Sequence, residues 1–279
     1  MKYIRLELEV DESFHEQLIA ELMDMDFYGF EQLDDKLIAY VEATRYNDTN
    51  REYIEQILLA FPGAAFKEIN EIDEQNWNRV WEETIQPQRI GRFLVKPTWS
   101  AEQPSGDEIL LEIDPKMSFG TGYHPTTRLM LRQLDHLKLK NAEVMDAGTG
   151  TGILAIAAIK LGARHAVGFD TDPLCQENAG ENVLINEVSD KVDIRIGGIE
   201  QVRPGERFDC CLANINRNVI LEIIPFLIQH TKTGGIICIS GLLDSDEEII
   251  REKLSAENVH IVDFQQEEEW ILFQLEKTG

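Results

Sequence analysis

A glycine-rich segment, DAGTGTG, begins at Asp146 and lies between an apolar run typical of a strand and one typical of a helix. Because glycine has no Cβ, such a segment lets the backbone turn sharply and lets a ligand lie directly against it. The spacing alone leaves a dinucleotide open, since a fingerprint that starts at Gly150 permits the alanine found at Ala155. Asp146, inside the predicted strand, favours S-adenosylmethionine instead, with Gly148 and Gly150 against the cofactor.

A second acidic residue, Asp170, closes the next apolar segment (AVGFD), 22 residues after Gly148. In nucleotide-binding α/β folds an acid at about this distance (~20 residues) accepts hydrogen bonds from the ribose hydroxyls. The alternative is a helix cap, because Asp170 comes just before Asp172-Pro173 at a predicted helix start. Since the glycine-rich segment ends the neighbouring strand, both would lie at one edge of the sheet. We therefore predict that Asp170 binds the cofactor.

The third polar position is Asn214, at the end of the apolar segment DCCLANI. In a doubly wound sheet this strand end faces the same crevice as the glycine-rich segment. An Asn oxygen can accept hydrogen bonds from a substrate amine and leave the amine lone pair aimed at a methyl donor. We predict that Asn214 contacts the cofactor and acts in catalysis by orienting the amine; its alternative role is to cap a helix beginning near Arg217. Adenine methylation is disfavoured, because two prolines and an aromatic residue do not follow Asn214.

The segment IDPKMSFGTGYHPTTR, residues 113–128, predicts a glycine-containing loop followed by a helix that starts near Pro125. Such a loop can close over a bound cofactor, with Phe119 packing on it and Thr127 bonding its carboxylate. His124 is a candidate base, although a histidine taken singly is more often structural.

The elements that position these residues alternate from residue 143 onward between apolar strand segments and helical segments. Strands crossed by helices imply a doubly wound, mostly parallel sheet with helices on both faces. The last two strands, VHIVDFQQ and EWILFQLE, are joined by a short acidic turn and form an antiparallel pair. The predicted fold is α/β, a seven-stranded methyltransferase sheet with an antiparallel C-terminal strand.

The first 73 residues follow a different order, β-α-β-β-α-β, which is typical of a small ferredoxin-like α+β domain. We expect its first helix to be capped by Ser13 and its second to start at Asn50. A short helix with Trp77 and Trp81 on one face follows. The predicted organisation is a domain over 1–73, a linker helix over 74–90 and a larger domain over 91–279.

Acidic residues outnumber basic ones, with 51 Asp and Glu against 26 Lys and Arg in 279 residues, a formal charge of −25. Residues 1–75 contain six basic and 19 acidic residues, whereas residues 76–140 contain nine and eight. This balance disfavours direct contact with nucleic acid, which needs a basic face. A solvated surface is one interpretation of the acidity, and a basic partner is the other.

The four cysteines, Cys175, Cys210, Cys211 and Cys238, form no CxxC pair and have no metal-binding spacing. We expect reduced thiols and no metal site. The alternating start MKYIRLELEV does not resemble a signal peptide, and no apolar run approaches the ~18 residues of a membrane span. The expectation is a cytoplasmic protein, monomeric, without a membrane partner.

Several of these segments together resemble one family. FGTGYHPTTR is similar to the F-G-T-G-x-H-P-T-T signature of the bacterial methyltransferases that modify the eleventh protein of the large ribosomal subunit. VMDAGTGTGILAIAA, GFDTDP, LANI and EEEWILFQLEK resemble the family's successive catalytic motifs, and WNRVWEETIQPQRIGRFLVKPTW resembles its linker. The resemblance runs from about residue 74 to the end. Residues 1–73 match in predicted topology only.

The resemblance implies an S-adenosylmethionine-dependent class I enzyme that methylates amines of one basic ribosomal protein, its N-terminal α-amine and its lysines. It also implies a substrate-recognition role for the N-terminal domain, and cofactor contacts from Thr127, Gly148, Asp170 and Asn214. The sequence departs from the pattern at Thr149, where the family often has Cys, and at Asn216, where an apolar residue is common.

The expected reaction is in-line transfer of the sulfonium methyl group to an uncharged amine. Neutralising a lysine at pH 7 costs about 4.6 kcal/mol and an α-amine about 1 kcal/mol, so the α-amine is the easier target. The alternatives are a methyltransferase for another basic protein or for a small-molecule amine, a non-enzymatic interaction protein, and an NAD enzyme.

Overall fold

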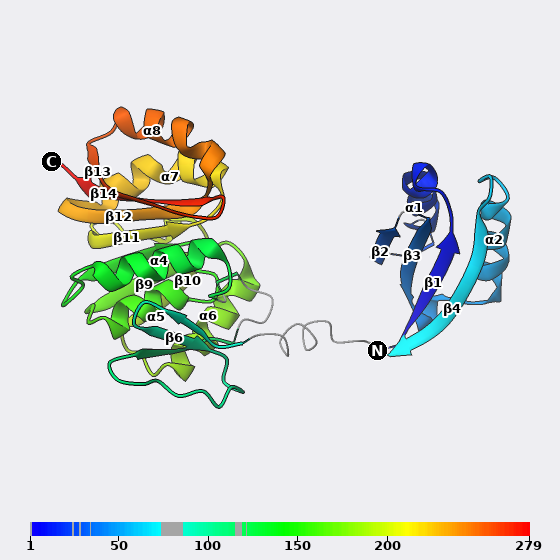
Figure 1. Cartoon of the computed structure of the whole chain (residues 1–279), viewed down its shortest axis with the longest axis horizontal. Coiled ribbons are helices and arrows are strands. Elements are labelled where there is room, and N and C mark those ends of the chain that lie inside the picture. The colour runs from blue at the N-terminus through cyan, green and yellow to red at the C-terminus, as the bar shows by residue number, and fades with distance from the viewer. Residues whose placement is uncertain are drawn as a thin grey trace. The chain divides into compact units, whose positions relative to one another are not determined.

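The computed structural model describes every residue except 1, 24, 28, 34, 74–85, 115–118 and 121. The chain divides into two compact units, residues 1–80 and 81–279 (Figure 1). The helix predicted to carry Trp77 and Trp81, and most of the predicted linker, lie outside the described residues. Strand β5 (Gln88–Ile90) covers the end of the predicted linker and pairs with β6 (Phe93–Lys96) of the second unit.

The N-terminal unit is a four-stranded antiparallel sheet with two helices packed on it. Its elements are β1 (Lys2–Glu9), α1 (His15–Met23), β2 (Gly29–Leu33), β3 (Lys36–Glu42), α2 (Asp48–Leu58) and β4 (Ala65–Asp73). The strand order β2-β3-β1-β4 is that of the predicted ferredoxin-like arrangement. Alternate residues of β1, Leu6 and Leu8, are buried against Leu18, Leu22 and Ile54 of the helices, because side chains alternate across a strand.

Both helix starts predicted for this unit were wrong by a few residues. The Asp11 carboxylate, not Ser13, accepts the first hydrogen bond, from the Ser13 amide (3.0 Å), and a short 3₁₀ turn over Glu12–Phe14 precedes α1. Asn47 caps α2, because its side-chain oxygen accepts from the amides of Thr49 and Asn50. In each case the residue two or three positions upstream reaches the free amides of the first turn.

The second unit contains a seven-stranded sheet in the order β10-β9-β8-β11-β12-β14-β13 (Figure 1). The strands are β8 (Glu143–Ala147), β9 (His165–Asp170), β10 (Val192–Ile196), β11 (Phe208–Asn214), β12 (Thr231–Leu243), β13 (Val259–Glu267) and β14 (Trp270–Lys277). The first five in that order run parallel, and β14 is antiparallel to both β12 and β13. The predicted fold class is confirmed.

Helices cover both faces of this sheet (Figure 1). They are α4 (Pro125–His136), α5 (Ile153–Lys160), α6 (Pro173–Ile185), α7 (Arg217–His230) and α8 (Glu247–Ser255). Neighbours on β8 divide between two cores: Val144 packs with α4 and α5, and Met145 packs with α7 and α8. Sequence analysis missed α8, whose two turns (EEIIREKLS) contribute only Ile250 and Leu254 to the core.

A small three-stranded sheet, β5-β6-β7, leads into the segment that precedes α4. β7 (Ile109–Glu112) pairs in parallel with β6 and lies at the edge of this sheet. Cys210, Cys211 and Cys238 are buried in the cores and all four cysteines are free thiols, as expected. Among the described residues, no helix is long and apolar enough to cross a membrane.

Candidate active site

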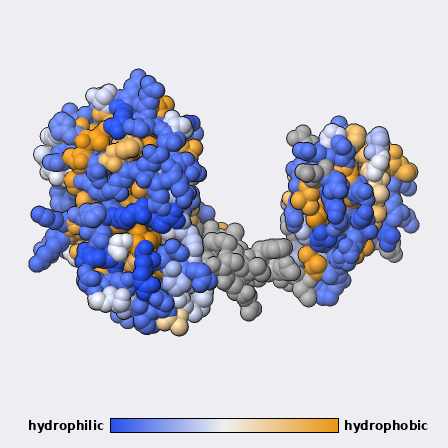
Figure 2. Space-filling model, in the orientation of Figure 1, coloured by the Kyte–Doolittle hydropathy of each residue, from blue (hydrophilic) through white to orange (hydrophobic). Residues whose placement is uncertain are grey.

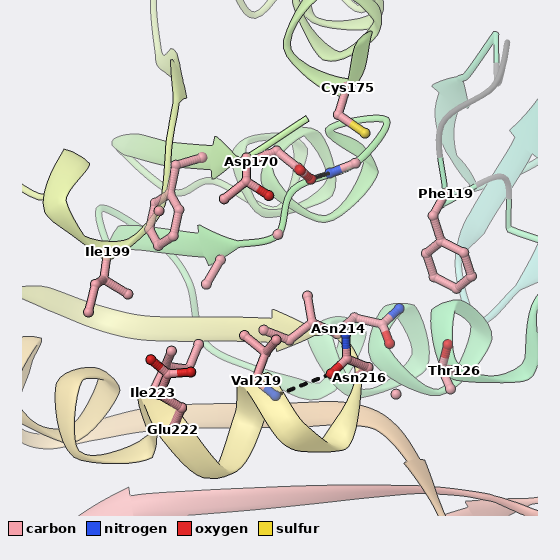
Figure 3. A pocket seen from close by; sticks show the side chains of 18 of the residues that line it. Phe119, Thr126, Asp170, Cys175, Ile199, Asn214, Asn216, Val219, Glu222 and Ile223 are labelled. Atoms are coloured by element: carbon pink, nitrogen blue, oxygen red, sulfur yellow. Dashed lines mark hydrogen bonds between the residues drawn. The ribbon is translucent and has the colours of Figure 1, made fainter. Parts of the chain in front are cut away.

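A cavity of about 610 Å³ opens at the carboxyl ends of the parallel strands. Its wall combines the ends of β8, β9 and β11, the turn after β10, the start of α7, and residues from β12 and β14 (Figure 3). This volume is within the ordinary range of small-molecule sites (roughly 300–1,000 Å³), and the crevice beyond the carboxyl ends of parallel strands is where open α/β sheets bind ligands.

Three glycines follow β8 with left-handed backbone, and two of them, Gly148 and Gly150, line the cavity. Gly148, Gly150 and Gly152 have φ angles of 71°, 53° and 82°. A Cβ at Gly148 would collide with the side chain of Ile215, and one at Gly150 with the carbonyl oxygen of Phe119. The close approach of two other segments therefore requires glycine, and Gly148 and Gly150 line the cavity as predicted.

Asp146 lies beneath this loop rather than in the cavity wall. It is 1% exposed, and its carboxylate accepts a hydrogen bond from the hydroxyl of Thr149 (2.7 Å). Burial raises the pKa of Asp146 to about 6, against the opposing effect of that hydroxyl. The acidic residue singled out in the sequence thus holds the loop from below.

Asp170 lines the cavity at the end of β9 and ties two loops together. Its carboxylate accepts from the amide of Gly150 (3.0 Å) and from the amide of Asp172 (3.1 Å). Asp172, not Asp170, caps α6, because its carboxylate accepts from Leu174 (2.9 Å). The helix-cap alternative for Asp170 is therefore wrong, and its side chain lies among the residues that line the cavity (Figure 3).

Asn214 lines the cavity at the end of β11, between β8 and β12. Its amide oxygen is buried and has no hydrogen-bond partner within the described part of the chain. Asn216, not Asn214, caps α7 by accepting from the amide of Val219 (3.2 Å; Figure 3). A buried amide oxygen without a partner is costly, so a ligand donor that reaches it would be bound favourably.

An aromatic row forms the wall on the α4 side. The ring of His124 lies 5.1 Å from Phe119 and 4.5 Å from Trp270 by ring centroids, edge to face in both cases. All three rings line the cavity, and Phe119 is 50% exposed. Arg128 on α4 pairs with Glu267 at the end of β13, which holds the helix against the hairpin that carries Trp270.

His124 is the N-cap of α4, and this role fixes its protonation. The Thr126 amide donates to Nδ1 (3.3 Å), and the Thr126 hydroxyl lies 2.8 Å from the same nitrogen. Because an amide can only donate, Nδ1 carries no proton and the neutral ring is protonated on Nε2. Burial and the nearby Arg128 lower the pKa of His124. A ring whose unprotonated nitrogen is already occupied by Thr126 is poorly suited to act as a base.

Thr127 is the one predicted site residue that is not part of the cavity wall. Its side chain is fully buried, and its hydroxyl oxygen has no partner among the described residues. Its neighbour Thr126 lines the cavity instead.

Sequence analysis missed much of the opposite wall. After β10, Gly197, Gly198, Ile199 and Glu200 line the cavity, and Gly197 has a φ of 128°. The glycine pair that follows the apolar strand in RIGGIE is the signal that pointed to a turn here. The remaining wall residues that were not predicted are Ala147, Phe169, Thr171, Cys175, Ile215, Asn216, Val219, Glu222, Ile223 and Gly241.

The chemistry of this wall fits an adenosyl group with a positive sulfonium. Glycine positions leave room for backbone contact, the Asp170 carboxylate can accept from hydroxyl groups, and Phe169, Ile199 and Ile223 provide apolar surface for a ring. Within the described residues no three His, Cys, Asp or Glu side chains gather as a metal site.

Comparison with known proteins relates the whole chain to one family. Residues 7–278 match the family model described as ribosomal protein L11 methyltransferase (PrmA). A protein of that description from Chlorobaculum parvum is 39% identical over 274 residues, covering 96% of this chain and 94% of its own length. The corresponding protein of Chlorobaculum tepidum is 37% identical with the same coverage. The crystal structure of a ribosomal protein L11 methylase from Lactobacillus delbrueckii subsp. bulgaricus superposes with a TM-score of 0.65 at 27% identity, covering 70% of this chain and all of that one.

Proposed function

Because the chain belongs to the ribosomal protein L11 methyltransferase family, we propose that it methylates amine groups of an L11-type ribosomal protein. S-Adenosylmethionine is the methyl donor, as the sequence predicted. The observation that carries the proposal is the extent of the family match, which includes the N-terminal unit as well as the cavity.

The proposed cofactor contacts are Gly148, Gly150, Asp170, Phe119 and Thr127, and Asn214 is proposed to contact both the cofactor and the amine. The first two supply backbone without a Cβ, and the Asp170 carboxylate, already ordered by two amides, accepts hydroxyl donors. Phe119 provides an aromatic face at the wall. The buried hydroxyl of Thr127, which has no partner in the described chain, supports a hydrogen bond to the carboxylate of the cofactor.

Asn214 is the proposed catalytic residue. When bound, S-adenosylmethionine supplies an electrophilic methyl group on a sulfonium. The free amide oxygen of Asn214 accepts an N–H of the substrate amine and thereby directs the amine lone pair at that methyl. The amine lone pair would form the new N–C bond, the cofactor would leave as a neutral thioether with the electrons of the broken S–C bond, and the extra proton would pass to solvent.

The amine must react uncharged, because an ammonium group has no lone pair with which to form the new bond. His124, with its Nδ1 occupied by Thr126, is poorly placed to remove the proton. The N-terminal α-amine is then the easier target, and a desolvated site beside a sulfonium lowers the pKa of a lysine enough to admit it as well. We therefore propose that both the α-amine and lysine ε-amines are substrates.

The acidic N-terminal unit is the proposed docking module for the basic substrate. Residues 1–75 contain 19 acidic and six basic residues, and hydrophilic side chains cover much of the visible surface of both units (Figure 2). Opposite charges steer such partners together. We propose a cytoplasmic, monomeric enzyme that meets the ribosomal protein directly and does not bind nucleic acid.

Replacing Asn214 with Ala tests the catalytic part of the proposal. The variant should bind S-adenosylhomocysteine within about threefold of the parent chain and lose about 100-fold in kcat, since removing one orienting group costs about 3 kcal/mol. Full activity of Asn214→Ala would contradict the assignment. Stabilisation of the parent chain by NAD but not by S-adenosylhomocysteine in a melting experiment would contradict the cofactor.

A further inference from the structure

Helix α6 presents three buried asparagines along one face. Asn178, Asn182 and Asn186 follow one another at four-residue intervals and are 1%, 0% and 4% exposed. Buried amides of this kind are stable only when their hydrogen-bonding groups have partners. Residues four apart on a helix lie on the same face, so the three side chains point in one direction.

Two of them, Asn182 and the C-cap residue Asn186, pair with the end of β7 and the residues just beyond it as a neighbouring strand would. Asn178 only donates its side-chain N–H to the Asp114 carbonyl (2.8 Å). The Asn186 amide accepts from the Glu112 N–H (3.1 Å) and donates to the Glu112 carbonyl (2.6 Å). Asn182 does the same with Asp114, accepting at 2.9 Å and donating at 3.3 Å. The distance between the two asparagines along the helix matches the distance between Glu112 and Asp114 along the extended chain. Four residues of helix rise about 6 Å, and two residues of extended strand span about 6.6 Å.

Asn182 and Asn186 each make a third side-chain hydrogen bond. That of Asn186 stays within the helix, at the carbonyl oxygen of Asn182 (2.9 Å), whereas that of Asn182 reaches the glycine loop. The second N–H of Asn182 donates to the carbonyl oxygen of Thr151 (3.0 Å). Thr151 in turn donates its amide to the Phe119 carbonyl (2.9 Å) and its hydroxyl to the Gly120 carbonyl (2.7 Å). The Asn182 side chain therefore links Asp114 to the glycine loop. Through Thr151 it is also linked to Phe119, which lines the cavity.

We propose that Asn182 is a positioning residue for the cofactor site. Its amide fixes the glycine loop relative to the segment of Asp114, and through Thr151 it fixes the position of Phe119 at the cavity wall. Asn182 is fully buried and is not part of the wall itself, so it acts on a bound cofactor only through these neighbours. Asn186 supports the same segment but makes no bond to the glycine loop.

The matched pair Asn182→Asp and Asn186→Asp separates positioning from general stability. Each change keeps the size of the side chain and its acceptor oxygen. It replaces the buried NH₂ group, which donates to two carbonyl oxygens, by an oxygen atom that these carbonyl oxygens repel. We expect a similar drop in melting temperature for both. Asn182→Asp should weaken S-adenosylhomocysteine binding by about tenfold or more, and Asn186→Asp by less than about threefold.

Hydrogen exchange at the Thr151 amide provides a second readout. Because this amide donates to Phe119, it should exchange at least about tenfold faster in Asn182→Asp than in the parent chain, with little change in Asn186→Asp. If Asn182→Asp does not fold, Asn182→Ser removes the amide without adding a charge, and the same two results are expected of it.

Equal loss of cofactor affinity in the Asn182 and Asn186 variants, or unchanged Thr151 exchange in the Asn182 variant, would overturn the inference. This inference rests on the proposed function, because the affinity measurement requires that the chain binds the cofactor. Hydrogen exchange at Thr151 does not depend on the proposed function, since it is measured without cofactor. Failure of the parent chain to bind S-adenosylhomocysteine would contradict the proposed function and leave the exchange result to decide the role of Asn182.

Discussion

Replacing Asp146 with Asn should stabilise the folded catalytic unit above pH 6. Asp146 is 1% exposed, and burial raises its pKa from the ordinary 3.8 to about 6. This difference means that an ionised Asp146 costs the folded state about 3 kcal/mol at pH 7. The folded state binds the proton more tightly than the unfolded chain does. The contribution to stability is therefore complete below pH 3.8 and is lost as the pH rises through 6.

Urea unfolding of the parent chain and of Asp146→Asn at pH 5 and pH 7.5 measures this effect. Any packing or hydrogen-bond cost of the new amide is the same at both pH values and cancels in the comparison. Proton linkage predicts that the parent loses about 1.4 kcal/mol more than the variant between the two pH values. Parallel pH dependence in the two proteins would refute the reasoning.

The same substitution should weaken the binding of the cationic cofactor. The Asp146 charge lies beneath the glycine loop, where a negative charge attracts a sulfonium. Asp146→Asn should therefore lower the affinity for S-adenosylmethionine about fivefold more than the affinity for the neutral thioether S-adenosylhomocysteine, a difference of about 1 kcal/mol. Equal loss for both ligands in calorimetry would show that the charge has no such role. A gain in stability with a loss of affinity is the expected trade-off at a functional site.

Three further predictions test the other parts of the site. Asp170→Ala removes the carboxylate that accepts from Gly150 and Asp172, and should weaken S-adenosylhomocysteine about 100-fold in calorimetry; undiminished affinity would remove Asp170 from the site. His124→Asn keeps a helix-capping side chain, and because the amine reacts uncharged without a base, lysine methylation should rise about tenfold per pH unit from pH 7 to 9 in both proteins; a flat profile in the parent that becomes steep in the variant would identify His124 as a base. Raising salt from 50 to 500 mM should raise the KM of the full chain for the ribosomal protein about tenfold through screening of residues 1–75, whereas an unchanged KM would mean that their acidity serves solubility alone.

The site residues that were predicted from the sequence are those that belong to short local sequence patterns. The glycines at 148 and 150 and the acid at 170 follow strands in a recognisable order, because in a parallel sheet successive strand ends meet at one edge. Asn214 was placed in the same way. Most of the second unit followed from alternating strand and helix patterns. The short, strongly charged α8 was missed, and so was β5, which lies within the predicted linker helix.

The parts that were missed depend on contacts between residues far apart in the chain. Trp270 reaches His124 because β14 lies antiparallel beside β12, and no pattern near residue 270 indicates that neighbour. Asn182 is an ordinary polar residue of a helix until α6 meets the residues just beyond β7. The turn of α4 brings Thr126 to the cavity wall, which the sequence did not indicate, and leaves the predicted Thr127 buried behind it. Sequence spacing fixes which strand end a residue follows, and packing decides which side chain reaches the cavity.

The most direct test of the proposed function is methylation of unmodified L11 by the purified full chain. L11 is incubated with the chain and S-adenosylmethionine, beside an unrelated basic protein of similar charge, and the intact mass and modified peptides are measured. We predict methyl groups on the N-terminal α-amine and on lysines of L11, none on the control protein, and at most a trace with Asn214→Ala. An unchanged L11 mass under conditions in which the chain binds S-adenosylmethionine, or equal methylation of the control protein, would contradict the proposed substrate.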